Sequence, residues 1–396
     1  MSNLPWGNNQ NLTDNEFYNR EGELSTLKNL LETTSQGHAP DIFLTCLRGV
    51  GKTVFLQKIK RELDDEYLVI YLDFSRAECF QKNRMSITGL LNYFFKEIMI
   101  ECQKRNLNTL NKKIEKYLKT NDFKIKDVIR VNSIPIPLFS SENNSEKTMD
   151  FVFKLLEKLY DENREKLKGI LIFIDEFQII KDLNEYMESF LWNMRSYIQN
   201  QRNIAYLFSG SMSMQDKLIS DVAGYNGVFG GRMLTLTIYP FTKETVKSYL
   251  DEKAPEISFT EDGFERFYSC TSGIPSYVNI FASLLPIDKQ LDKDDIVFEF
   301  DRKISAISSH LINIWTRLSY REQSIIVELI SKPLRRKDIA DNLNISPGSL
   351  SNYLTKLQNE GLILLDNNKY ALSEPILKRW LELEYKQKGV YPYRQI

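Results

Sequence analysis

A short segment in the first part of the chain has the residue types of a phosphate-binding loop. Residues 46–53 read Cys-Leu-Arg-Gly-Val-Gly-Lys-Thr and begin at the end of the apolar run Ile42–Leu47. A glycine-rich loop between a strand and a helix directs backbone N–H groups at phosphate oxygens, and the positive end of the helix dipole adds to this. We expect Lys52 to neutralise the β- and γ-phosphates of ATP and the Thr53 hydroxyl to ligate Mg²⁺. The other positions expected to line the nucleotide are Arg48, Gly49, Val50, Gly51 and Val54.

Cys46 stands where the usual loop pattern has its first glycine. The two glycines closest to the phosphates, Gly49 and Gly51, are present, so we expect this departure to weaken nucleotide binding at most. The alternative is a chance match in a turn that opens a helix. A second nucleotide-binding motif that follows in the expected order would make a chance match less plausible.

Two carboxylates end the apolar run that begins at Gly169. Residues 169–176 read Gly-Ile-Leu-Ile-Phe-Ile-Asp-Glu, and charges at the end of a buried strand require compensation. A metal ion and a polarised water would supply it. Asp175 is expected to hold the Mg²⁺ shell together with Thr53, and Glu176 to polarise the attacking water as a general base. The competing interpretation is a solvated loop after the strand.

Polar residues near two further apolar runs are candidates for sensing the γ-phosphate. Ser209 and Ser211 follow the run Ile204–Phe208, and Ser209 is the first choice for contacting phosphate or placing the water. A serine-rich turn is the alternative. Arg232 precedes the last apolar run and is a candidate transition-state arginine, acting within its own chain or from a neighbouring subunit. It is equally a candidate partner for Asp221 or for another carboxylate.

Five short apolar runs predict the strands that would position these residues. The runs lack strict alternation, which is typical of strands buried on both faces of a parallel sheet. Helical patterns such as Val54–Asp64 and Glu185–Gln199 separate them, so we expect an α/β fold with right-handed βαβ units and a doubly wound sheet. The runs are Ile42–Leu47, Leu68–Phe74, Ile170–Ile174, Ile204–Phe208 and Leu234–Ile238.

Three domains are predicted along the chain. Residues 1–241 form the α/β core, interrupted at about 103–148 by an insertion that is partly helical and partly extended, with disorder considered for Ser140–Lys147. Residues 242–317 have no strand pattern after Pro240 and indicate a helical lid and linker. Residues 318–396 form a further module. The predicted lid helices are Lys243–Leu250, Glu261–Ser269 and Ser276–Leu284.

The last domain has the element order of a winged helix-turn-helix. Its first helix has a capping box of Ser319 and Glu322, and Pro347 is expected in the first position of its third helix. Gly361 closes the third helix, and a hairpin over residues 362–372 follows. The predicted helices are Ser319–Leu329, Arg336–Leu343 and Ser346–Leu357.

Two kinds of partner fit a winged helix. Its third helix enters the major groove of DNA in many such folds, and the wing touches the backbone. The slight excess of Lys and Arg in this domain does not by itself establish phosphate contacts, because these usually need a denser basic stripe. Packing on the core or on a protein partner is the alternative. The candidate DNA contacts are Arg335, Arg336, Lys337, Asn352, Lys356 and Lys369.

The composition excludes several other classes. A net charge of −1 marks no general nucleic-acid or membrane binder, and four cysteines without a CxxC pair, with only two histidines, do not supply a zinc site. Free thiols fit a reducing cytoplasm. Met1–Gln10 lacks a signal pattern, and no apolar run is long enough to span a bilayer. We therefore expect a cytoplasmic protein without membrane contact.

These motifs together resemble those of STAND-type AAA+ P-loop ATPases, within the archaeal-type ATPase group that also occurs in bacteria. Residues 17–23 resemble the hhGRExE element that precedes the loop strand, with Asn19 in place of its glycine. Asparagine tolerates positive φ well. Four further segments are similar to other elements of the group. They are Asp-Glu-Phe-Gln at 175–178, Phe-Ser-Gly-Ser at 208–211 followed by Met214, Gly-Gly-Arg at 230–232 and Gly-Ile-Pro at 273–275.

The resemblance implies a fold and roles that spacing alone does not provide. It implies a P-loop NTPase sheet of the ASCE type, in the order 5-1-4-3-2. It also implies an adenine bordered by Arg20, Glu21 and Pro275. Without the resemblance, residues 273–275 are a helix break before Ser276.

The function that follows is an ATP-driven molecular switch. Nucleotide with Mg²⁺ would lie between the core and the lid, and hydrolysis or exchange would reorient the winged helix. One alternative is a replication-initiator or loader-like DNA-binding AAA+ ATPase. The lid argues against it, because it carries Gly-Ile-Pro and not an arginine-bearing sensor helix. The other is a regulatory scaffold with little turnover. It would need a damaged acidic motif, whereas Asp175 and Glu176 are both present. A protein partner, a homo-oligomer and the biological process all stay open.

Overall fold

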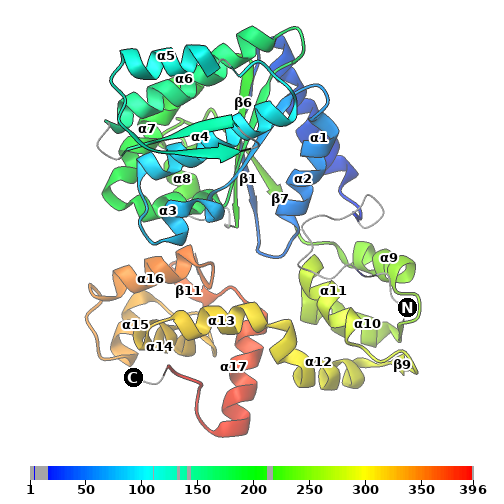
Figure 1. Ribbon diagram of the computed structural model, residues 1–396. Helices are drawn as coiled ribbons and strands as arrows, with labels where there is room; N and C mark the ends of the chain where they lie inside the picture. The colour runs from blue at the N-terminus through cyan, green and yellow to red at the C-terminus, as the bar shows by residue number, and fades with distance from the viewer. Residues whose placement is uncertain are drawn as a thin grey trace.

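The computed structural model describes residue 4 and residues 17–109, 111–131, 134–140, 144–211 and 217–394. Most of Met1–Gln10, part of Ser140–Lys147 and Met214 lie outside the described residues. Figure 1 shows an α/β core above a second lobe that holds the lid helices and the C-terminal module.

A parallel sheet of five strands forms the centre of the core, in the order β2-β5-β6-β1-β7. Counted along the chain and read from β7, this is the order 5-1-4-3-2, so the topology implied by the resemblance is confirmed. All five predicted runs are strands, because each supplies apolar side chains to the interior. The strands are β1 (Asp41–Cys46), β2 (Leu68–Asp73), β5 (Ile170–Asp175), β6 (Ile204–Ser211) and β7 (Leu234–Ile238).

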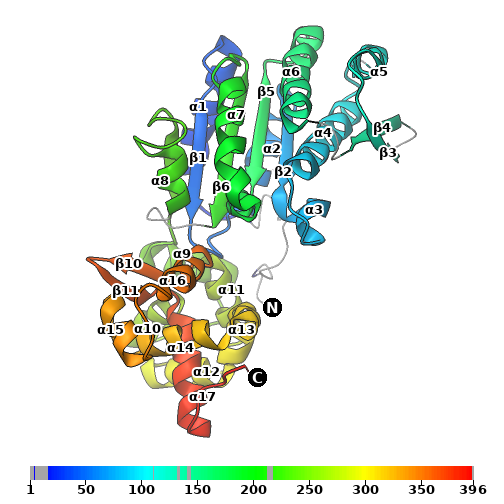
Figure 2. The ribbon, with the colours of Figure 1, turned by 90° about the vertical axis from the view of Figure 1, so that its left-hand side faces the viewer.

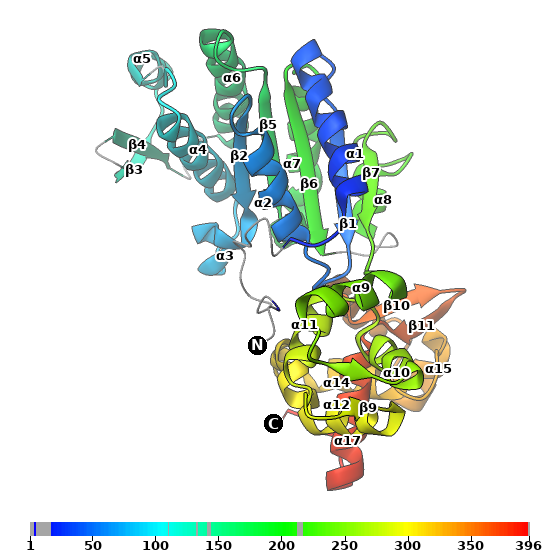
Figure 3. The ribbon, with the colours of Figure 1, turned by 90° about the vertical axis from the view of Figure 1, so that its right-hand side faces the viewer.

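Two layers of helices cover the sheet, because alternate residues of each strand face opposite sides. In β5, Ile170, Ile172 and Ile174 join one apolar cluster, whereas Leu171 and Phe173 join another. The second cluster is closed by α1 (Glu21–Glu32) and α2 (Lys52–Leu63), which lie together on one face in Figure 3. The first cluster is closed by α4 (Ile87–Lys104), α6 (Ser145–Asn163), α7 (Met187–Ile198) and α8 (Lys217–Ala223).

The stretch predicted as an insertion lies beyond the β2 edge of the sheet (Figures 2 and 3). It contains helix and extended structure, as expected: α5 (Asn111–Thr120) and the antiparallel hairpin β3 (Ile125–Val131) and β4 (Ile134–Phe139). The rings of Phe95, Phe139 and Phe151 pack with centroids 5.4–5.6 Å apart. This aromatic cluster anchors the hairpin to α4 and α6.

The lid helices are α9 (Lys243–Lys253), α10 (Glu261–Thr271) and α11 (Pro275–Ser283), followed by α12 (Lys293–Ile307) and α13 (Ser309–Arg317). The expectation that strands end at Pro240 was wrong. Two-residue strands, β8 (Ser258–Phe259) and β9 (Gln290–Leu291), pair in parallel across α10 and α11. Strands this short leave no apolar run for sequence analysis to detect.

The C-terminal module has the three helices and the hairpin that were predicted. They are α14 (Tyr320–Leu329), α15 (Arg336–Asn342), α16 (Leu350–Asn359), β10 (Ile363–Asp366) and β11 (Lys369–Leu372). The Ser319–Glu322 capping box and a positive φ at Gly361 are confirmed. Pro347, however, lies in a turn before α16, where its carbonyl accepts a hydrogen bond of 2.7 Å from Arg336 Nε.

An additional helix, α17 (Pro375–Lys388), joins the C-terminal module to the lid. Arg379 of α17 donates hydrogen bonds of 2.9 and 2.6 Å to Asp301 of α12. One apolar cluster runs from Phe267 and Phe281 of the lid to Leu377 of α17. Residues 242–317 and 318–396 therefore share a core, and a boundary between them stays a prediction.

The described part of the chain contains no helix of sufficient length and apolar character to cross a bilayer.

Candidate functional site

The loop between β1 and α2 has the backbone geometry that its glycines predict. Gly49 and Gly51 have φ of 82° and 98°, and Gly51 is the N-cap of α2. A Cβ at Gly49 would lie 2.2 Å from Ser276 Oγ, and the Gly49 carbonyl accepts a hydrogen bond of 3.2 Å from Ser276 N. The loop therefore packs against the first turn of α11. Burial raises the pKa of the Cys46 thiol to about 12, so Cys46 acts as a small apolar residue at the strand end.

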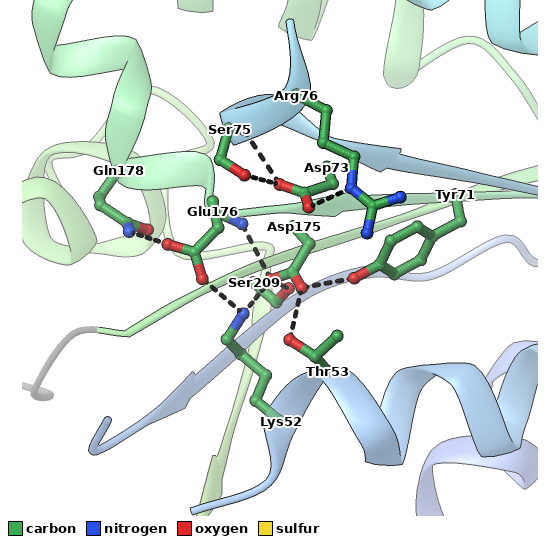
Figure 4. A network of polar contacts seen from close by, with 10 residues as sticks. All are labelled: Lys52, Thr53, Tyr71, Asp73, Ser75, Arg76, Asp175, Glu176, Gln178 and Ser209. Atoms are coloured by element: carbon green, nitrogen blue, oxygen red, sulfur yellow. Dashed lines mark hydrogen bonds and ion pairs between the residues drawn. The ribbon is translucent and has the colours of Figure 1, made fainter. Parts of the chain in front are cut away.

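Lys52 and Thr53, the first two residues of α2, contact the acidic end of β5 (Figure 4). Lys52 Nζ donates to Asp175 Oδ1 and lies 3.3 Å from Glu176 Oε1. Thr53 Oγ1 donates to Asp175 Oδ2 at 3.1 Å, and Ser209 Oγ donates to Asp175 Oδ1 at 2.8 Å. Five residues predicted from three separate segments thus form one hydrogen-bonded network at the carboxyl edge of the sheet.

Lys52 and Asp175 form a buried ion pair, with side chains 4% and 2% exposed. Burial disfavours both charged forms, but the opposite charge and the hydrogen bonds outweigh it. As a result, the pKa of Lys52 is raised and that of Asp175 is lowered. Removing either partner would leave a buried charge uncompensated. Lys52 can therefore turn to another anion at low cost only if a different cation replaces it at Asp175.

Glu176 differs from Asp175 in its exposure. Its side chain is 30% exposed, and Oε2 accepts a hydrogen bond of 2.5 Å from Gln178 Nε2. Its backbone is left-handed, with φ of 54°, which is uncommon for a residue other than glycine. The strand ends at Asp175, so the Glu176 side chain lies partly open to solvent beside Lys52 and Gln178. A carboxylate held in this way is suited to orient a water molecule.

One residue of the network and one acid beside it were missed in the sequence, and both lie on β2. Tyr71 OH donates to Asp175 Oδ2 at 2.6 Å. Asp73, which pairs in register with Asp175, accepts hydrogen bonds from Ser75 N and Ser75 Oγ and lies 3.1 Å from Arg76 Nε. The signal available was that β2, like β5, ends in an aspartate. This aspartate could be assigned to the site only with the strand order of the sheet, which places β2 beside β5.

Arg20 contacts the loop rather than remaining free at its surface. Arg20 Nη2 donates to the carbonyls of Val50 and Tyr239 at 3.0 and 3.1 Å, and its guanidinium lies 4.9 Å from the Phe241 ring centroid. Burial lowers the pKa of Arg20, although nearby Glu23 opposes this. Arg20 thus ties the segment before α1, the loop and the end of β7 together. The positive φ expected at Asn19 is confirmed at 58°.

A second residue implied to border the base lies at the lid. Pro275 is the first residue of α11 and half-buried, directly before Ser276, which contacts the loop. Gly273 has φ of 65°, and a Cβ there would lie 2.0 Å from the Phe241 carbonyl oxygen. Gly-Ile-Pro is therefore a close-packed joint between core and lid. Glu21, at the start of α1, is exposed.

The structure does not bring Arg232 into the network. Leu234 pairs with Ile42 near the start of β1, so Arg232 lies at the edge of the sheet opposite the loop. Its side chain is exposed, and it forms no ion pair with Asp221 or any other carboxylate among the described residues. A role within its own chain is therefore not supported by this geometry. Ser211 ends β6, but its side chain lies outside the described residues.

Arg48 and Val54 flank the loop. Arg48 is exposed at the loop surface, and Val54 is half-buried in the first turn of α2. Neither contacts the charged network directly.

Comparison with known proteins decides the class of this site. A family model for an ATPase domain predominantly from Archaea matches residues 17–281. The chain belongs to this family of ATPases. An uncharacterized ATP-binding protein of Methanocaldococcus jannaschii is 25% identical over 277 residues, covering 66% of this chain and 68% of the relative. One of Pyrococcus horikoshii is 24% identical over 270 residues, covering 66% and 73%.

Two solved structures share the fold of this ATPase along nearly its whole length. A Walker-type ATPase of Pyrococcus abyssi superposes with a TM-score of 0.61 at 18% identity, covering 94% of this chain and 99% of that one. The ORC2 protein of Aeropyrum pernix, in complexes with ADPNP and ADP, has a TM-score of 0.51 at 13% identity, covering 98% and 100%. These likenesses establish the fold: a P-loop ATPase core followed by helical domains.

The donor set of the ATPase fits a magnesium ion. Thr53 Oγ1 and Asp175 Oδ2 are hard oxygen ligands 3.1 Å apart. The described residues contain no group of three or more His, Cys, Asp and Glu side chains that would hold a metal by themselves. Mg²⁺ commonly takes one or two protein oxygens and completes its shell with phosphate and water. Thr53 and Asp175 are therefore the residues that would hold it.

Two candidate DNA contacts of the ATPase are already engaged. Lys356 Nζ lies 2.8 Å from Glu322 Oε1, whose side chain is 3% exposed, and Arg336 binds the Pro347 carbonyl. Lys356 is exposed, as expected, and contact of either residue with DNA stays a prediction, although each one ties α16 or its preceding turn to an earlier helix. The remaining candidates are exposed: Arg335, Lys337, Asn352 and Lys369. Helix α16 lies on the side of its lobe that faces the core (Figures 1 and 2).

A second contact links the lid of the ATPase to its last helix. Tyr277 OH, in the first turn of α11, donates to Glu374 Oε2 at 3.3 Å. Glu374 is the N-cap residue of α17. Burial raises its pKa to about 7, and the Tyr277 hydrogen bond and the charge of Arg48 only partly offset this. The nucleotide loop, the lid and the C-terminal module thus meet at one carboxylate.

This carboxylate predicts a pH dependence of stability. Because the folded-state pKa of Glu374 exceeds its unfolded value, the associated stability is fully present below the unfolded pKa and is lost as the pH rises through about 7. Glu374→Gln should therefore increase the free energy of unfolding above pH 7 by about 1–3 kcal/mol and have little effect at low pH. Denaturant unfolding across pH would measure this. Glu360→Gln, at an exposed site after α16, is the control, and parallel curves for Glu374→Gln and wild type would contradict the prediction.

Proposed function

We propose that this ATPase is a Mg²⁺-dependent, ATP-hydrolysing molecular switch of the STAND type, whose winged-helix module contacts DNA or a protein partner. The observation that supports it is the network of Lys52, Thr53, Asp175, Glu176 and Ser209 at the carboxyl edge of the sheet. Lys52 binds the β- and γ-phosphates, Glu176 orients the attacking water, and Ser209 senses the γ-phosphate. The division into residues 1–241, 242–317 and 318–396 is part of the same proposal.

The switch operates through the partners of Lys52. In the described network Lys52 is paired with both acids, so an incoming triphosphate competes with Asp175 and Glu176 for the same ammonium. Bound Mg²⁺ supplies charge neutralisation at Asp175 and the transferred phosphoryl group. Lys52 then turns to the phosphates, and Glu176 is free to bind water. Only contacts that differ between the ATP and ADP states can drive a conformational change, and the partners of Lys52 are such contacts.

Transmission to the C-terminal module runs through α11. The Gly49 carbonyl binds Ser276 N, and the adjacent Tyr277 holds Glu374 at the start of α17. When the loop closes on phosphate, its contact with α11 therefore changes. The position of α11 changes with it, and so does the position of α17. Because the lid and the module share one apolar cluster, they move as a unit relative to the core.

Hydrogen exchange tests the switch. Exchange is compared between the full chain with ADP and with a non-hydrolysable ATP analogue, each with Mg²⁺. We expect a difference in α11 and at the N-terminus of α17, not only in the loop. The matched variant is Tyr277→Phe, which keeps the ring but removes the hydrogen bond, and should reduce the difference at α17. Identical exchange at α11 and α17 in the two nucleotide states would rule out a switch.

The second candidate, a replication-initiator or loader-like DNA-binding ATPase, is favoured by the fold shared with the ORC2 protein over the whole chain. It differs from the switch in requiring sequence-selective duplex binding by the winged helix. Arg335→Ala/Lys337→Ala would then weaken binding to a preferred duplex more than binding to an unrelated one. Equal weakening for every duplex would disfavour it.

A further inference from the structure

A basic pocket lies outside the nucleotide site, between α3 (Glu78–Gln81), the first half of α4 and the β3–β4 hairpin. Its volume is about 500 Å³. Figures 2 and 3 show these elements at the β2 side of the core, away from α1 and α8. Residues 76–96 supply most of its wall, and the hairpin of the insertion closes it with Lys126, Ile129, Leu138 and Phe139.

Five cationic residues and a single acid line this pocket. The cations are Arg76, Lys82, Arg84, Lys96 and Lys126, and the acid is Glu78. Two of the cations are neutralised, since Arg76 pairs with Asp73 and Lys82 with Glu78. The other three have no ion pair with any residue that the structure describes. An excess of positive charge therefore remains in one concave surface.

The three unpaired cations converge although they come from different elements. Arg84 precedes α4, Lys96 lies on α4 and Lys126 lies on β3. Lys82 is the main cause of the lowered pKa of Glu78, but Lys126 and Lys96 also contribute, so their charges act on the same space. Arg84 and Lys126 are exposed and Lys96 is half-buried. Because like charges repel, an anion between these side chains would reduce their repulsion.

We propose that this pocket binds the sugar–phosphate backbone of a nucleic acid, independently of the winged helix. Phosphodiester groups are spaced anions that match separate Arg and Lys side chains, and the pocket wall adds the hydroxyl of Ser86. Phe139 in the wall is 1% exposed and cannot stack on a base. The other aromatic residue in the wall, Tyr93, is half-buried, so we assign the contact to phosphates on the cationic side chains alone, which makes it independent of sequence. Helix α3 lies at the end of the core that faces the lobe carrying α16, so both basic surfaces border the same side of the molecule (Figures 1 and 2).

Charge reversal at exposed positions tests the pocket. The full-length chain with Arg84→Glu/Lys126→Glu is titrated with fluorescent single-stranded and duplex oligonucleotides of mixed sequence, at low and at physiological salt. We expect binding to weaken about tenfold or more at low salt, and the slope of log K against log salt to decrease by about 2, because two phosphate contacts are lost. Retention of a fluorescent ATP analogue confirms that the variant is folded.

A matched control distinguishes loss of a specific binding site from a general effect of the net charge of the protein. Lys112→Glu/Lys116→Glu makes the same change in charge on exposed residues of α5, in the same lobe. It should bind nucleic acid nearly as wild type does, and equal weakening in the two variants would overturn the proposal. So would unchanged binding by Arg84→Glu/Lys126→Glu when Arg335→Glu/Lys337→Glu abolishes it. Binding of polyglutamate in place of any oligonucleotide would overturn the assignment to nucleic acid.

Discussion

Glu176→Gln is expected to bind ATP with nearly wild-type affinity and to hydrolyse it about 10²–10⁴ times more slowly. Glutamine keeps the size and the hydrogen bond of 2.5 Å with Gln178, but it cannot accept a proton from water. The change also removes one of the two acids that compete with phosphate for Lys52, so affinity should not fall. Single-turnover hydrolysis and equilibrium binding of a fluorescent ATP analogue would measure the two effects separately.

The control for this variant makes the same chemical change nearby. Glu185→Gln alters an exposed glutamate in the segment that follows Glu176 and should hydrolyse ATP at the wild-type rate. If Glu176→Gln also turns over normally, Glu176 is not the general base and the proposed hydrolytic mechanism fails. Loss of both binding and turnover would instead assign Glu176 to nucleotide binding.

Lys52→Ala should have a second large effect, on binding rather than on the chemical step alone. Each hydrogen bond from an ammonium to a charged phosphate contributes about 1.5–3 kcal/mol, so we expect Kd for ATP to rise roughly 10- to 150-fold. The variant also leaves Asp175 buried without its cation, which is expected to destabilise the nucleotide-free protein by about 3–5 kcal/mol. Isothermal titration and denaturant unfolding would measure the two losses.

Lys58→Ala is the matched control, because Lys58 lies on the same helix and pairs with Glu62 at 3.5 Å. It should leave the affinity for ATP unchanged. Titration is performed where circular dichroism shows Lys52→Ala to be folded, so that weak binding is not confused with unfolding. Wild-type affinity in folded Lys52→Ala would contradict the phosphate-binding role of the loop.

Features that depend on local pattern were predictable from the sequence. The strands were predictable because each must fill two helical layers and so reads as a continuous apolar run, as in Ile170–Ile174. The loop was predictable because two glycines with positive φ leave a pattern that few other structures require. The position of Asp175 at a strand end was equally visible, since a charge after a buried run stands out.

Features that depend on strand order or on contacts between distant segments were not predictable in this way. Tyr71 joins Asp175 only because β2 lies beside β5, and Arg232 lies far from the loop because β7 starts at the opposite edge. The Tyr277–Glu374 contact joins residues 97 positions apart. No local periodicity records such a pairing.

The sequence by itself therefore determined the chemistry of the nucleotide site: a loop lysine, a hydroxyl and two acids, each marked by its local setting. The tertiary structure alone decided which residues surround that chemistry. It placed Tyr71 on the Asp175 carboxylate, used Lys356 to neutralise buried Glu322, and gathered Arg84, Lys96 and Lys126 in one pocket. The physical reason is that backbone geometry and burial act over a few residues, whereas the packing of sheet, insertion and lid brings together side chains that the chain keeps far apart.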